Sequence, residues 1–558
     1  MAAFVGRPTG TGCELLISYA CLLGTLAYLG HWTPDYLAGR SLWHFTISRM
    51  IIPLIALAAL ASWARLIPSA LLLASFLLAI GTVSAIKREA LGEPFQTSDI
   101  LLAGQGPALF GYVSWSQWLV ALAVLIAAAI YLWNSRVRVW SFPLFSICVA
   151  LLISCRSEAV MTFVHDYLPP WGIENLPFDQ VASERMNGLA THLYLSGAGV
   201  RLSHFSRDEM AAALARLDPE DVRTAAGGRR PDIYIVLGEA WWRDPSDQRS
   251  PLDDLLKAGF LEGTAVSPVY GGTTPNAEFE VLTGIPAHTF STAIVPYQHY
   301  FRYFTAPRTL PRLLSPLGYS AHAYHNHNRA FWLRDRVYPR FGFETFEAAE
   351  TMKLVKQANG WAKDDVLYEA ALKSETTPAP EFSFLVTVAT HGPYEDDLEF
   401  DPPTAKGSGD YRRRLGGAVA ALLGFERQLR QKGRPFVLIV FGDHLPGIPA
   451  YQRDIGLAEG DPRLHQVPVL VAGTEPNLDG LRDDLNGRPL FCIAPVLVSW
   501  ARLGVEDVYF RDVAKHCRER NQSITVAEPI IQHQLFSPLA DQIESLGEYQ
   551  PASDNLHR

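Results

Sequence analysis

Residues 271–279, Gly-Gly-Thr-Thr-Pro-Asn-Ala-Glu-Phe, combine a flexible loop with the start of a helix. Pro275 suits the first helical position, because it has no N–H to leave unpaired. A residue before proline avoids the helical conformation, so the pattern predicts Thr274 at the N-cap. Free amide donors at a helix N-terminus favour an anion. The Thr274 hydroxyl is therefore either a simple cap or a nucleophile that attacks phosphorus.

Polar side chains follow three apolar runs, at the points where strands should end. Glu239 follows the first run, residues 390–392 (Thr-His-Gly) follow the second, and residues 442–444 (Gly-Asp-His) follow the third. Each motif alone is typical of a solvated turn, but ligands bind beyond the carboxyl ends of parallel strands. Two carboxylates, an imidazole and a hydroxyl form a four-ligand set without thiolate, which suits Mn, Mg or Zn.

The elements that must position these residues are short apolar runs separated by helical stretches. They lie at residues 233–237, 383–388, 436–441 and 467–471, with a weaker run at 320–324. Nearly continuous apolar strands of this kind predict an α/β fold with a mainly parallel sheet.

Long apolar runs in the first 155 of the 558 residues predict an α-helical transmembrane domain. Arg65 and Pro68 divide the long apolar stretch 51–86 into two helices. The distribution of Lys and Arg does not settle orientation. Five spans, with the C-terminal part outside the cytoplasm, are preferred over four; they are predicted at residues 13–31, 47–63, 67–86, 116–133 and 140–155.

Composition and cysteine usage narrow the classes of function. The net charge of −9 argues against non-specific nucleic-acid binding. The six cysteines do not form a disulfide framework; Cys492 and Cys517 either pair in an oxidising compartment or are buried as free thiols. Residues 89–114 are predicted as an interfacial amphipathic helix or an ordinary loop.

Five motifs, in this order, resemble the lipoteichoic acid synthase and membrane phosphoglycerol transferase family, in the sulfatase-like branch of the alkaline phosphatase superfamily. They are residues 237–239 (Leu-Gly-Glu), 272–279, 331–335 (Phe-Trp-Leu-Arg-Asp), 390–394 (Thr-His-Gly-Pro-Tyr) and 441–444 (Phe-Gly-Asp-His).

The resemblance covers almost the whole chain and implies four parts. They are a transmembrane domain at 1–156, an extracytoplasmic helical linker at 157–230, a sulfatase-like catalytic domain at 231–535 and a polar tail at 536–558.

The resemblance also implies a metal and a nucleophile. Thr274 would be the nucleophile; Thr273 competes for this role, but the family pattern at residues 278–279 and the helix-start argument both favour Thr274. The metal is most often assigned as manganese in the family, with magnesium or zinc as alternatives, and its implied ligands are Glu239, Thr274, Asp443 and His444.

A second group of residues would bind the substrate. The resemblance implies that Trp332, Arg334 and His391 hold the glycerophosphate group, and Arg suits this role because its donors form a fork. His391 would also donate a proton to the departing lipid alkoxide. The alternative for Trp332 is core packing. His325 stands where the family often carries a histidine, and its role stays open.

The implied activity is transfer of glycerophosphate from phosphatidylglycerol to an acceptor hydroxyl through a phospho-threonine intermediate. The acceptor would be a surface glycan, a periplasmic glucan or a polyglycerophosphate chain. The expected location is the bacterial inner membrane, with the catalytic domain on the periplasmic side and no nucleic-acid partner. Trp241 and Trp242 would stack on sugar, pack under the sheet or touch the bilayer.

Three alternatives differ in chemistry. A true sulfatase needs a Cys or Ser in a Cys/Ser-x-Pro-x-Arg context, whereas this chain has Thr274 and, four residues on, Glu278. A phosphoethanolamine transferase acting on a lipid or glycan would share the membrane anchor and the Thr nucleophile, but such enzymes carry a disulfide-rich soluble domain. A non-catalytic membrane protein with a sulfatase-like fold would not need an intact ligand set.

Overall fold

The structure is a computed structural model of the 558-residue chain. The residues that it describes are 42–91, 94–97, 115–135, 141–174, 180–197, 206–218, 230–287, 307–357, 360–373, 378–392, 394–395, 407–457 and 461–519, with the separate positions 14, 17, 18, 20–22, 24, 25, 99, 297, 530 and 531. The predicted polar tail, most of segment 89–114 and most of the first predicted span lie outside them.

The chain divides into two compact units. One comprises Met1–Arg201 with Ser291–Ile294, and the other comprises Leu202–Phe290 with Val295–Arg558. The described helices of the first unit are α3 (Leu42–Ala61), α4 (Leu66–Leu91), α5 (Trp115–Asn134), α6 (Phe142–Ile153), α7 (Glu158–Tyr167), α8 (Gln180–Asn187) and α9 (Leu189–Ser196), with single 3-10 turns η3 (Ser154–Arg156) and η4 (Pro169–Trp171).

The first unit is helical, as predicted, and the break between α3 and α4 falls at residues 62–65. Apolar side chains of these two helices form a buried cluster that includes Met50, Leu57, Leu73 and Leu77. Among the described residues, one helical stretch, Leu66–Arg88, is long and apolar enough to cross a bilayer. The predicted multi-pass arrangement is therefore not supported by helix length: α6, for example, has 12 residues, too few to cross about 30 Å of hydrocarbon.

The second unit contains an eight-stranded sheet with the order β4-β3-β5-β1-β6-β7-β2-β8. Its strands are β1 (Asp232–Gly238), β2 (Leu261–Val266), β3 (Ser320–His325), β4 (Thr345–Ala348), β5 (Glu381–Val386), β6 (Phe436–Gly442), β7 (Gln466–Gly473) and β8 (Arg488–Pro489). All pairings are parallel except those that β7 makes with β6 and β2. The predicted mainly parallel α/β sheet is confirmed.

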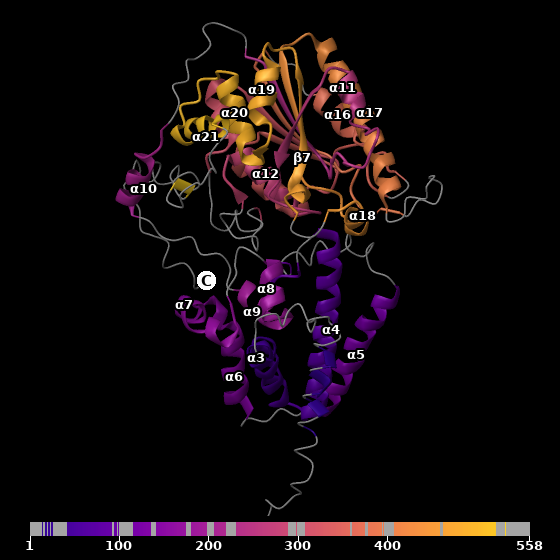
Figure 1. The fold of residues 1–558 in the computed structure, drawn as a ribbon, viewed down its shortest axis with the longest axis vertical. Helices are drawn as coiled ribbons and strands as arrows, with labels where there is room; N and C mark the ends of the chain where they lie inside the picture. The colour runs from indigo at the N-terminus through magenta and orange to yellow at the C-terminus, as the bar shows by residue number, and fades with distance from the viewer. Residues whose placement is uncertain are drawn as a thin grey trace, which may run out of the picture. The chain divides into compact units, whose positions relative to one another are not determined.

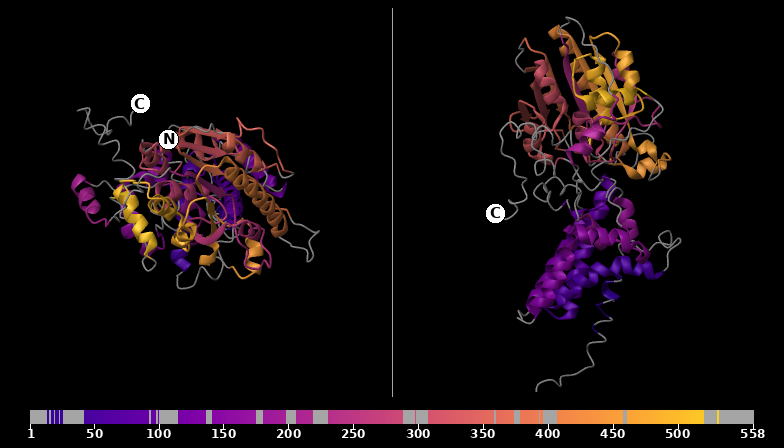
Figure 2. Two further views of the ribbon diagram at one scale, coloured as in Figure 1. Left: turned by 90° about the horizontal axis from the view of Figure 1, so that it is seen from above. Right: turned by 90° about the vertical axis from the view of Figure 1, so that its left-hand side faces the viewer.

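Helices cover both faces of this sheet (Figures 1 and 2). The helix α17 packs with α16 and α11 on one face, while α19 packs on β2 and β7 and contacts α20 and α21 on the other. The described helices of the unit are α10 (Arg207–Leu214), α11 (Asp253–Lys257), α12 (Thr274–Thr283), α14 (Leu310–Leu314), α15 (Arg334–Phe341), α16 (Asp365–Lys373), α17 (Ser408–Lys432), α18 (Pro449–Asp454), α19 (Leu478–Leu485), α20 (Ile493–Trp500) and α21 (Val508–Arg518), with 3-10 turns η6 (Ser315–Leu317), η7 (Phe331–Leu333), η8 (Pro462–His465) and η9 (Leu490–Cys492).

A disulfide joins η9 to α21. Cys492 and Cys517 are bonded, with their Cα atoms 5.9 Å apart, so the pairing that the sequence left open is formed. The bond closes a sequence separation of 25 residues. A loop of this size restricts the unfolded chain enough to stabilise the fold by about 3 kcal/mol in the chain-entropy model.

The carboxyl end of β6 leaves no room for a side chain at Gly442. A Cβ there would lie 2.3 Å from the Trp241 carbonyl oxygen, whereas a Cβ at Gly417 in α17 would meet nothing within 4 Å. We predict that Gly442→Ala destabilises the protein by about 2–3 kcal/mol through overpacking. The matched change Gly417→Ala should stabilise it by about 0.5–1 kcal/mol, because Ala is the better helix former. Thermal unfolding of both variants measures this, and equal shifts in Tm would contradict the close approach.

Candidate active site

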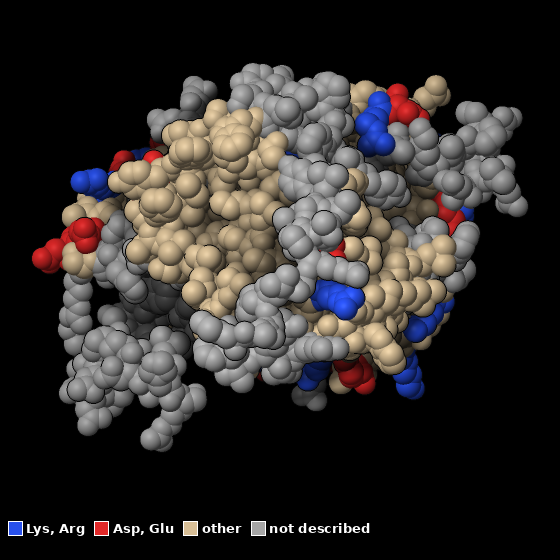
Figure 3. All heavy atoms as spheres, turned by 90° about the horizontal axis from the view of Figure 1, so that it is seen from below, with Lys and Arg blue, Asp and Glu red and all other residues tan. Residues whose placement is uncertain are grey.

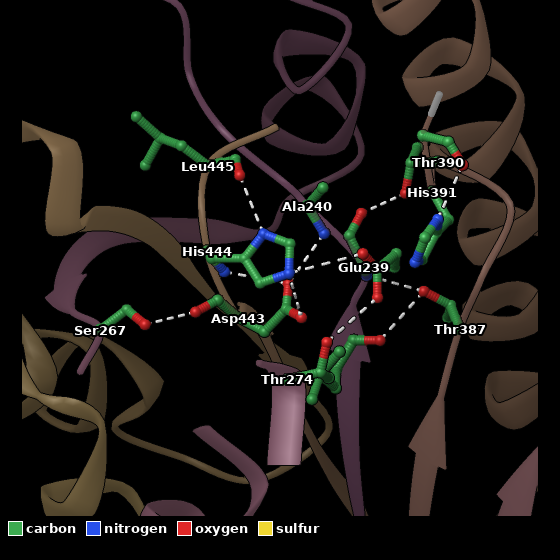
Figure 4. Close-up of polar contacts among 12 residues, drawn as sticks. Glu239, Ala240, Ser267, Thr274, Thr387, Thr390, His391, Asp443, His444 and Leu445 are labelled. Carbon is green, nitrogen blue, oxygen red and sulfur yellow. Dashed lines mark hydrogen bonds and ion pairs between the residues drawn. The ribbon is translucent and has the colours of Figure 1, made fainter. Parts of the chain in front are cut away.

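Three neighbouring strands deliver the polar residues to one place. β1 lies between β5 and β6 in the sheet and is parallel to both, so their carboxyl ends are adjacent. Glu239 follows β1, and Asp443 and His444 follow β6; one ligand atom from each lies within 4.8 Å of the others (Figure 4). All three residues are buried. The structure therefore brings together three of the four predicted metal ligands as one group.

Backbone contacts hold this group together. The Ala240 N–H donates to Asp443 Oδ1 at 2.8 Å, and the Glu239 N–H donates to Thr387 Oγ1 at 2.9 Å. The Thr390 hydroxyl donates to the Glu239 carbonyl oxygen, and the Ser267 hydroxyl donates to that of Asp443. Each end of the site is thus tied to a neighbouring strand or loop.

The contacts of His444 define which ring nitrogen faces the carboxylates. Its Nδ1 lies 2.8 Å from the Leu445 carbonyl oxygen, which can only accept, so Nδ1 carries the proton of the neutral ring. Its Nε2 lies 3.1 Å from Asp443 Oδ2 and 3.6 Å from Glu239 Oε1. An Nε2 lone pair fixed by an Nδ1–H bond to a carbonyl is the arrangement typical of a histidine metal ligand.

The charges of the site also fit a cation. Asp443 Oδ2 is buried and has no hydrogen-bond partner among the described residues. Burial, and then the charge of Asp443, raise the pKa of Glu239 well above its ordinary value, while Arg334 opposes the shift. Two buried carboxylates that repel each other are stabilised by a cation between them, so these residues fit a divalent metal.

Thr274 lies beside this group. Its buried hydroxyl is 3.5 Å from Glu239 Oε2. The predicted N-cap position was wrong by one residue: α12 begins at Thr274, and Thr273 precedes it as the N-cap in the left-handed conformation, with φ 63°. Thr273 makes no side-chain cap hydrogen bond. The left-handed turn at Thr273 lets the chain enter the helix one residue before the proline.

Backbone strain concentrates around the predicted site residues. Ala240, Thr273, Trp332 and Leu333 have φ between 53° and 63°, in the left-handed region that residues with a Cβ rarely adopt. Each adjoins or is one of the predicted site residues. Strained backbone of this kind is often found at functional sites, where surrounding contacts hold it in place.

Arg334 forms a buried ion pair with Glu278. Its Nε lies 3.1 Å from Glu278 Oε1, its Nη2 pairs with the same oxygen, and both side chains are at most 1% exposed. The Tyr338 hydroxyl donates to Glu278 Oε2 at 2.7 Å. Because Glu278 is four residues after Thr274, the two lie on one face of α12. The ion pair therefore connects Arg334 to the helix that carries Thr274.

His325 contacts the same guanidinium. Its Nδ1 lies 3.0 Å from the Val386 carbonyl oxygen, so its Nε2 accepts from Arg334 Nη1 at 3.2 Å. Burial, and then the charge of Arg334, lower the pKa of His325 well below its ordinary value. The neutral ring thus orients Arg334, which answers structurally the question that the sequence left open.

The remaining predicted substrate residues lie on the neighbouring segments. Trp332, in η7, is partly exposed and its ring contacts that of Phe331 with centroids 5.6 Å apart. His391, just after Thr390, is half-buried, and its Nδ1 lies 2.8 Å from the Gly392 carbonyl oxygen. Burial lowers the pKa of His391 to about 4, so the ring is neutral at physiological pH.

Sequence reasoning missed several residues that support the site. The hydroxyls of Thr387 and Ser267 bind its backbone, yet single hydroxyls in a strand end or loop give no distinctive signal.

Trp241 and Trp242 are 0% and 4% exposed, so they pack in the core and the alternatives of sugar stacking and bilayer contact are wrong. The Tyr411 hydroxyl holds this turn by donating to the Ala240 carbonyl oxygen at 2.9 Å.

The second unit matches a known protein family, and the chain is similar to several known proteins. The Sulfatase family model matches residues 231–482. A Rhizobium meliloti (strain 1021) protein named for cyclic beta-1,2-glucan modification is 27% identical over 427 residues, covering 70% of this chain and 65% of its own length. A lipoteichoic acid synthase-like protein of Bacillus subtilis (strain 168) is 24% identical over 209 residues, covering 35% and 32%. The chain thus spans less than two thirds of the length of these curated relatives.

A solved Streptococcus pyogenes phosphoglycerol transferase in complex with sn-glycerol-1-phosphate is also similar, with 18% identity and a TM-score of 0.48. The match covers 60% of this chain and 95% of that one. The family model lies on the unit that contains the parallel sheet and the Glu239, Asp443 and His444 group. Residues 231–482 are therefore a domain of the sulfatase family, within the alkaline phosphatase superfamily.

Proposed function

We propose that this protein is a membrane-attached phosphoglycerol transferase that moves glycerophosphate from phosphatidylglycerol to an acceptor hydroxyl. The observation that carries the proposal is the Thr274 hydroxyl, 3.5 Å from Glu239 Oε2 at the edge of the buried Glu239, Asp443 and His444 group. A hydroxyl at a helix N-terminus beside such a group is placed to attack a phosphodiester.

The reaction has two half-reactions. In the first, Thr274 Oγ1 gives up its proton and attacks phosphorus, the bond from phosphorus to the diacylglycerol oxygen breaks, and that oxygen takes up a proton. In the second, the acceptor oxygen gives up its proton and attacks the same phosphorus, the bond to Thr274 breaks, and the Thr274 oxygen takes up a proton. Trp332 and Arg334 bind the glycerophosphate group, and Arg334 contributes positive charge that favours the phosphorane-like transition state.

His391 moves the proton in this scheme. Since its Nδ1–H donates to the Gly392 carbonyl oxygen, Nε2 carries the lone pair. With a pKa of about 4, the ring in the resting protein accepts a proton rather than donates one. We assign to Nε2 the proton of the attacking hydroxyl in each half-reaction, that of Thr274 in the first and that of the acceptor in the second. The protonated nitrogen then delivers this proton to the departing oxygen, that of diacylglycerol in the first half-reaction and that of Thr274 in the second.

One divalent metal completes the proposed site, held by Glu239, Thr274, Asp443 and His444, with manganese preferred over magnesium or zinc. When bound, it supplies positive charge that favours the ionised Thr274 oxygen and screens the phosphate. The His444 Nε2 lone pair and Asp443 Oδ2, which accepts no hydrogen bond from the described residues, support this set.

The first unit would hold the site next to its lipid donor. Large apolar side chains of α5 and α6 are exposed, among them Leu125 at 67%, Leu132 at 68% and Ile147 at 58%. Figure 3 shows a broad area without charged side chains on one face of the molecule. Apolar side chains exposed to this extent are stable in a bilayer and costly in water. The rings of Phe163 and Tyr167, stacked at 5.3 Å on the outside of α7, suit the lipid headgroup region.

The proposed location is the bacterial inner membrane, with the catalytic domain on the extracytoplasmic side. The Cys492–Cys517 disulfide supports an oxidising compartment. The relative named for cyclic beta-1,2-glucan modification supports a glucan as acceptor, with a surface glycan or polyglycerophosphate chain as the other candidates.

Thr274→Ala tests the nucleophile. The full chain is placed in lipid nanodiscs that contain phosphatidylglycerol labelled in its diacylglycerol part, with Mn²⁺, and diacylglycerol release is followed. We predict that the variant loses at least about 10³-fold in rate, because no other oxygen replaces the nucleophile. Peptide mass spectrometry should locate glycerophosphate on Thr274 of the wild-type protein.

The matched control is Thr273→Ala, which changes the neighbouring hydroxyl and should keep activity within about threefold of wild type. Undiminished release by Thr274→Ala, or an adduct on Thr273, would contradict the assignment. Faster turnover of phosphatidylethanolamine than of phosphatidylglycerol would favour the phosphoethanolamine transferase alternative, and inertness toward both lipids would favour a non-catalytic protein.

Metal binding has its own test, independent of activity. After chelation, we predict that Mn²⁺ at about 100 times its Kd stabilises the protein by about 2.7 kcal/mol, measured as a rise in Tm. Asp443→Asn should abolish the rise, because it weakens a buried ligand. The exposed-loop control Asp461→Asn, whose carboxylate pairs with Arg463, should preserve it. An unchanged rise in Asp443→Asn would exclude this metal site.

A further inference from the structure

An indole ring lies against the imidazole assigned to proton transfer. The ring centroids of Trp361 and His391 are 4.2 Å apart, with 35° between the ring planes. Trp361 lies between β4 and α16, in a part of the chain that the sequence motifs did not include. Close ring contact of this kind restricts how the imidazole can rotate.

The two rings share one hydrogen-bond acceptor. Trp361 Nε1–H donates to the Gly392 carbonyl oxygen at 2.9 Å, and His391 Nδ1 lies 2.8 Å from the same oxygen. A carbonyl oxygen has two lone pairs and can accept both donors. The indole therefore fixes the position of the oxygen that determines which nitrogen of His391 carries the proton.

Trp361 is itself anchored to the end of β5. The Gln357 N–H donates to the Trp361 carbonyl oxygen at 2.7 Å, and a β-bridge joins Lys356 to Ala362. Gln357 Nε2 donates to the Ala389 carbonyl oxygen at 2.9 Å, two residues before His391. The loop that carries the indole is thus tied to the segment that carries the imidazole.

Other charged or titratable groups around His391 come from three further segments. Arg414 of α17 donates from Nη1 to the His391 carbonyl oxygen at 2.7 Å. His327 packs its ring on Trp361 at 5.2 Å, and His444 acts on His391 through its charge. Within the described residues, the His391 ring itself contacts the Gly392 carbonyl oxygen and the Trp361 indole.

We propose that Trp361 is a positioning residue: it holds the imidazole of His391 with Nδ1–H bonded to the Gly392 carbonyl oxygen and Nε2 available for proton transfer. The role rests on the proposed function, since it acts through the proton step assigned to His391. The tilted ring contact restricts the plane of the imidazole, and the shared carbonyl fixes its tautomer. Misplacement of a proton-transfer group by about 1 Å costs about 10²-fold in rate.

A double-mutant cycle on the full chain in nanodiscs tests this role. Trp361→Leu removes both contacts, and we expect kcat for diacylglycerol release to fall about 10²-fold while KM changes less than about threefold. Trp361→Phe keeps an aromatic ring against the imidazole and loses the N–H, so its kcat should lie between those of Trp361→Leu and wild type. In the His391→Ala background, Trp361→Leu should cause no further loss, because its effect passes through the imidazole.

Full additivity of the two changes, or a loss confined to KM, would overturn the proposal. Trp500→Phe is the matched control: Trp500 Nε1 also donates to a backbone carbonyl, that of Asn477, at 2.9 Å, and its loss should leave kcat unchanged.

A second measurement does not depend on activity. Diethylpyrocarbonate at pH 7 modifies neutral imidazoles, and peptide mass spectrometry gives the rate at His391. We expect this rate to rise at least about fivefold in Trp361→Leu, because the ring loses its cover, while Trp500→Phe matches wild type. An unchanged rate would overturn the proposal. Inactivity of wild type together with the expected change in this rate would reject the proposed function and retain the Trp361–His391 contact.

Discussion

The two buried carboxylates of Glu239 and Asp443 impose the main constraint on this domain. They leave adjacent strands and cannot both be ionised at low cost without positive charge nearby. The structure supplies the His444 ring, with Nε2 toward them, and Arg334 at longer range. A bound cation satisfies the remaining charge. The same arrangement that makes the site costly without positive charge therefore favours binding of a cation.

The backbone around the carboxylates explains how they come so close. Gly238 and Gly442 end β1 and β6, and a Cβ on either would collide with Trp241, by its ring in one case and its carbonyl oxygen in the other. The following Ala240 has a φ of 53°, and its N–H bonds to Asp443. The buried Trp241 thus packs closely against the last residue of both strands. Close approach, strain and the charged pair are thus parts of one local structure.

The central sheet was predictable, because β1, β5, β6 and β7 are buried on both faces and appear as apolar runs. The sequence did not indicate β2 or β4: β2 alternates in burial and contains Glu262 and Gly263, and β4 has only four residues. The composition of β7 also does not indicate that this strand runs antiparallel to its neighbours. Strand direction depends on connections and pairing, which apolar patterning does not encode.

The residues at strand ends were predictable for the same reason as the strands. A motif directly after an apolar run has its position fixed by the sheet. The start of α12 was misplaced by one residue, because the left-handed conformation of Thr273 is unusual for a residue with a Cβ. Trp361 was missed because its contact with His391 crosses 30 positions of chain, and a tryptophan in a loop usually reports only packing. Contacts between distant loops are set by the completed fold.

The buried Glu278–Arg334 pair links the chemistry of the site to its architecture. In the Cys/Ser-x-Pro-x-Arg context of true sulfatases, an arginine stands at the position four residues after the nucleophile, and here Glu278 occupies it. A carboxylate on the nucleophile helix would repel a phosphate, but its charge is neutralised by Arg334 from α15 and its second oxygen accepts from Tyr338. In this chain the arginine therefore lies on α15 and not on the helix that begins at Thr274. His325 and Glu278 together hold its guanidinium. Because Thr274 and Glu278 share one face of α12, a shift of that helix moves Thr274 and Arg334 together. The ion pair thus keeps Thr274 and Arg334 in a constant relation.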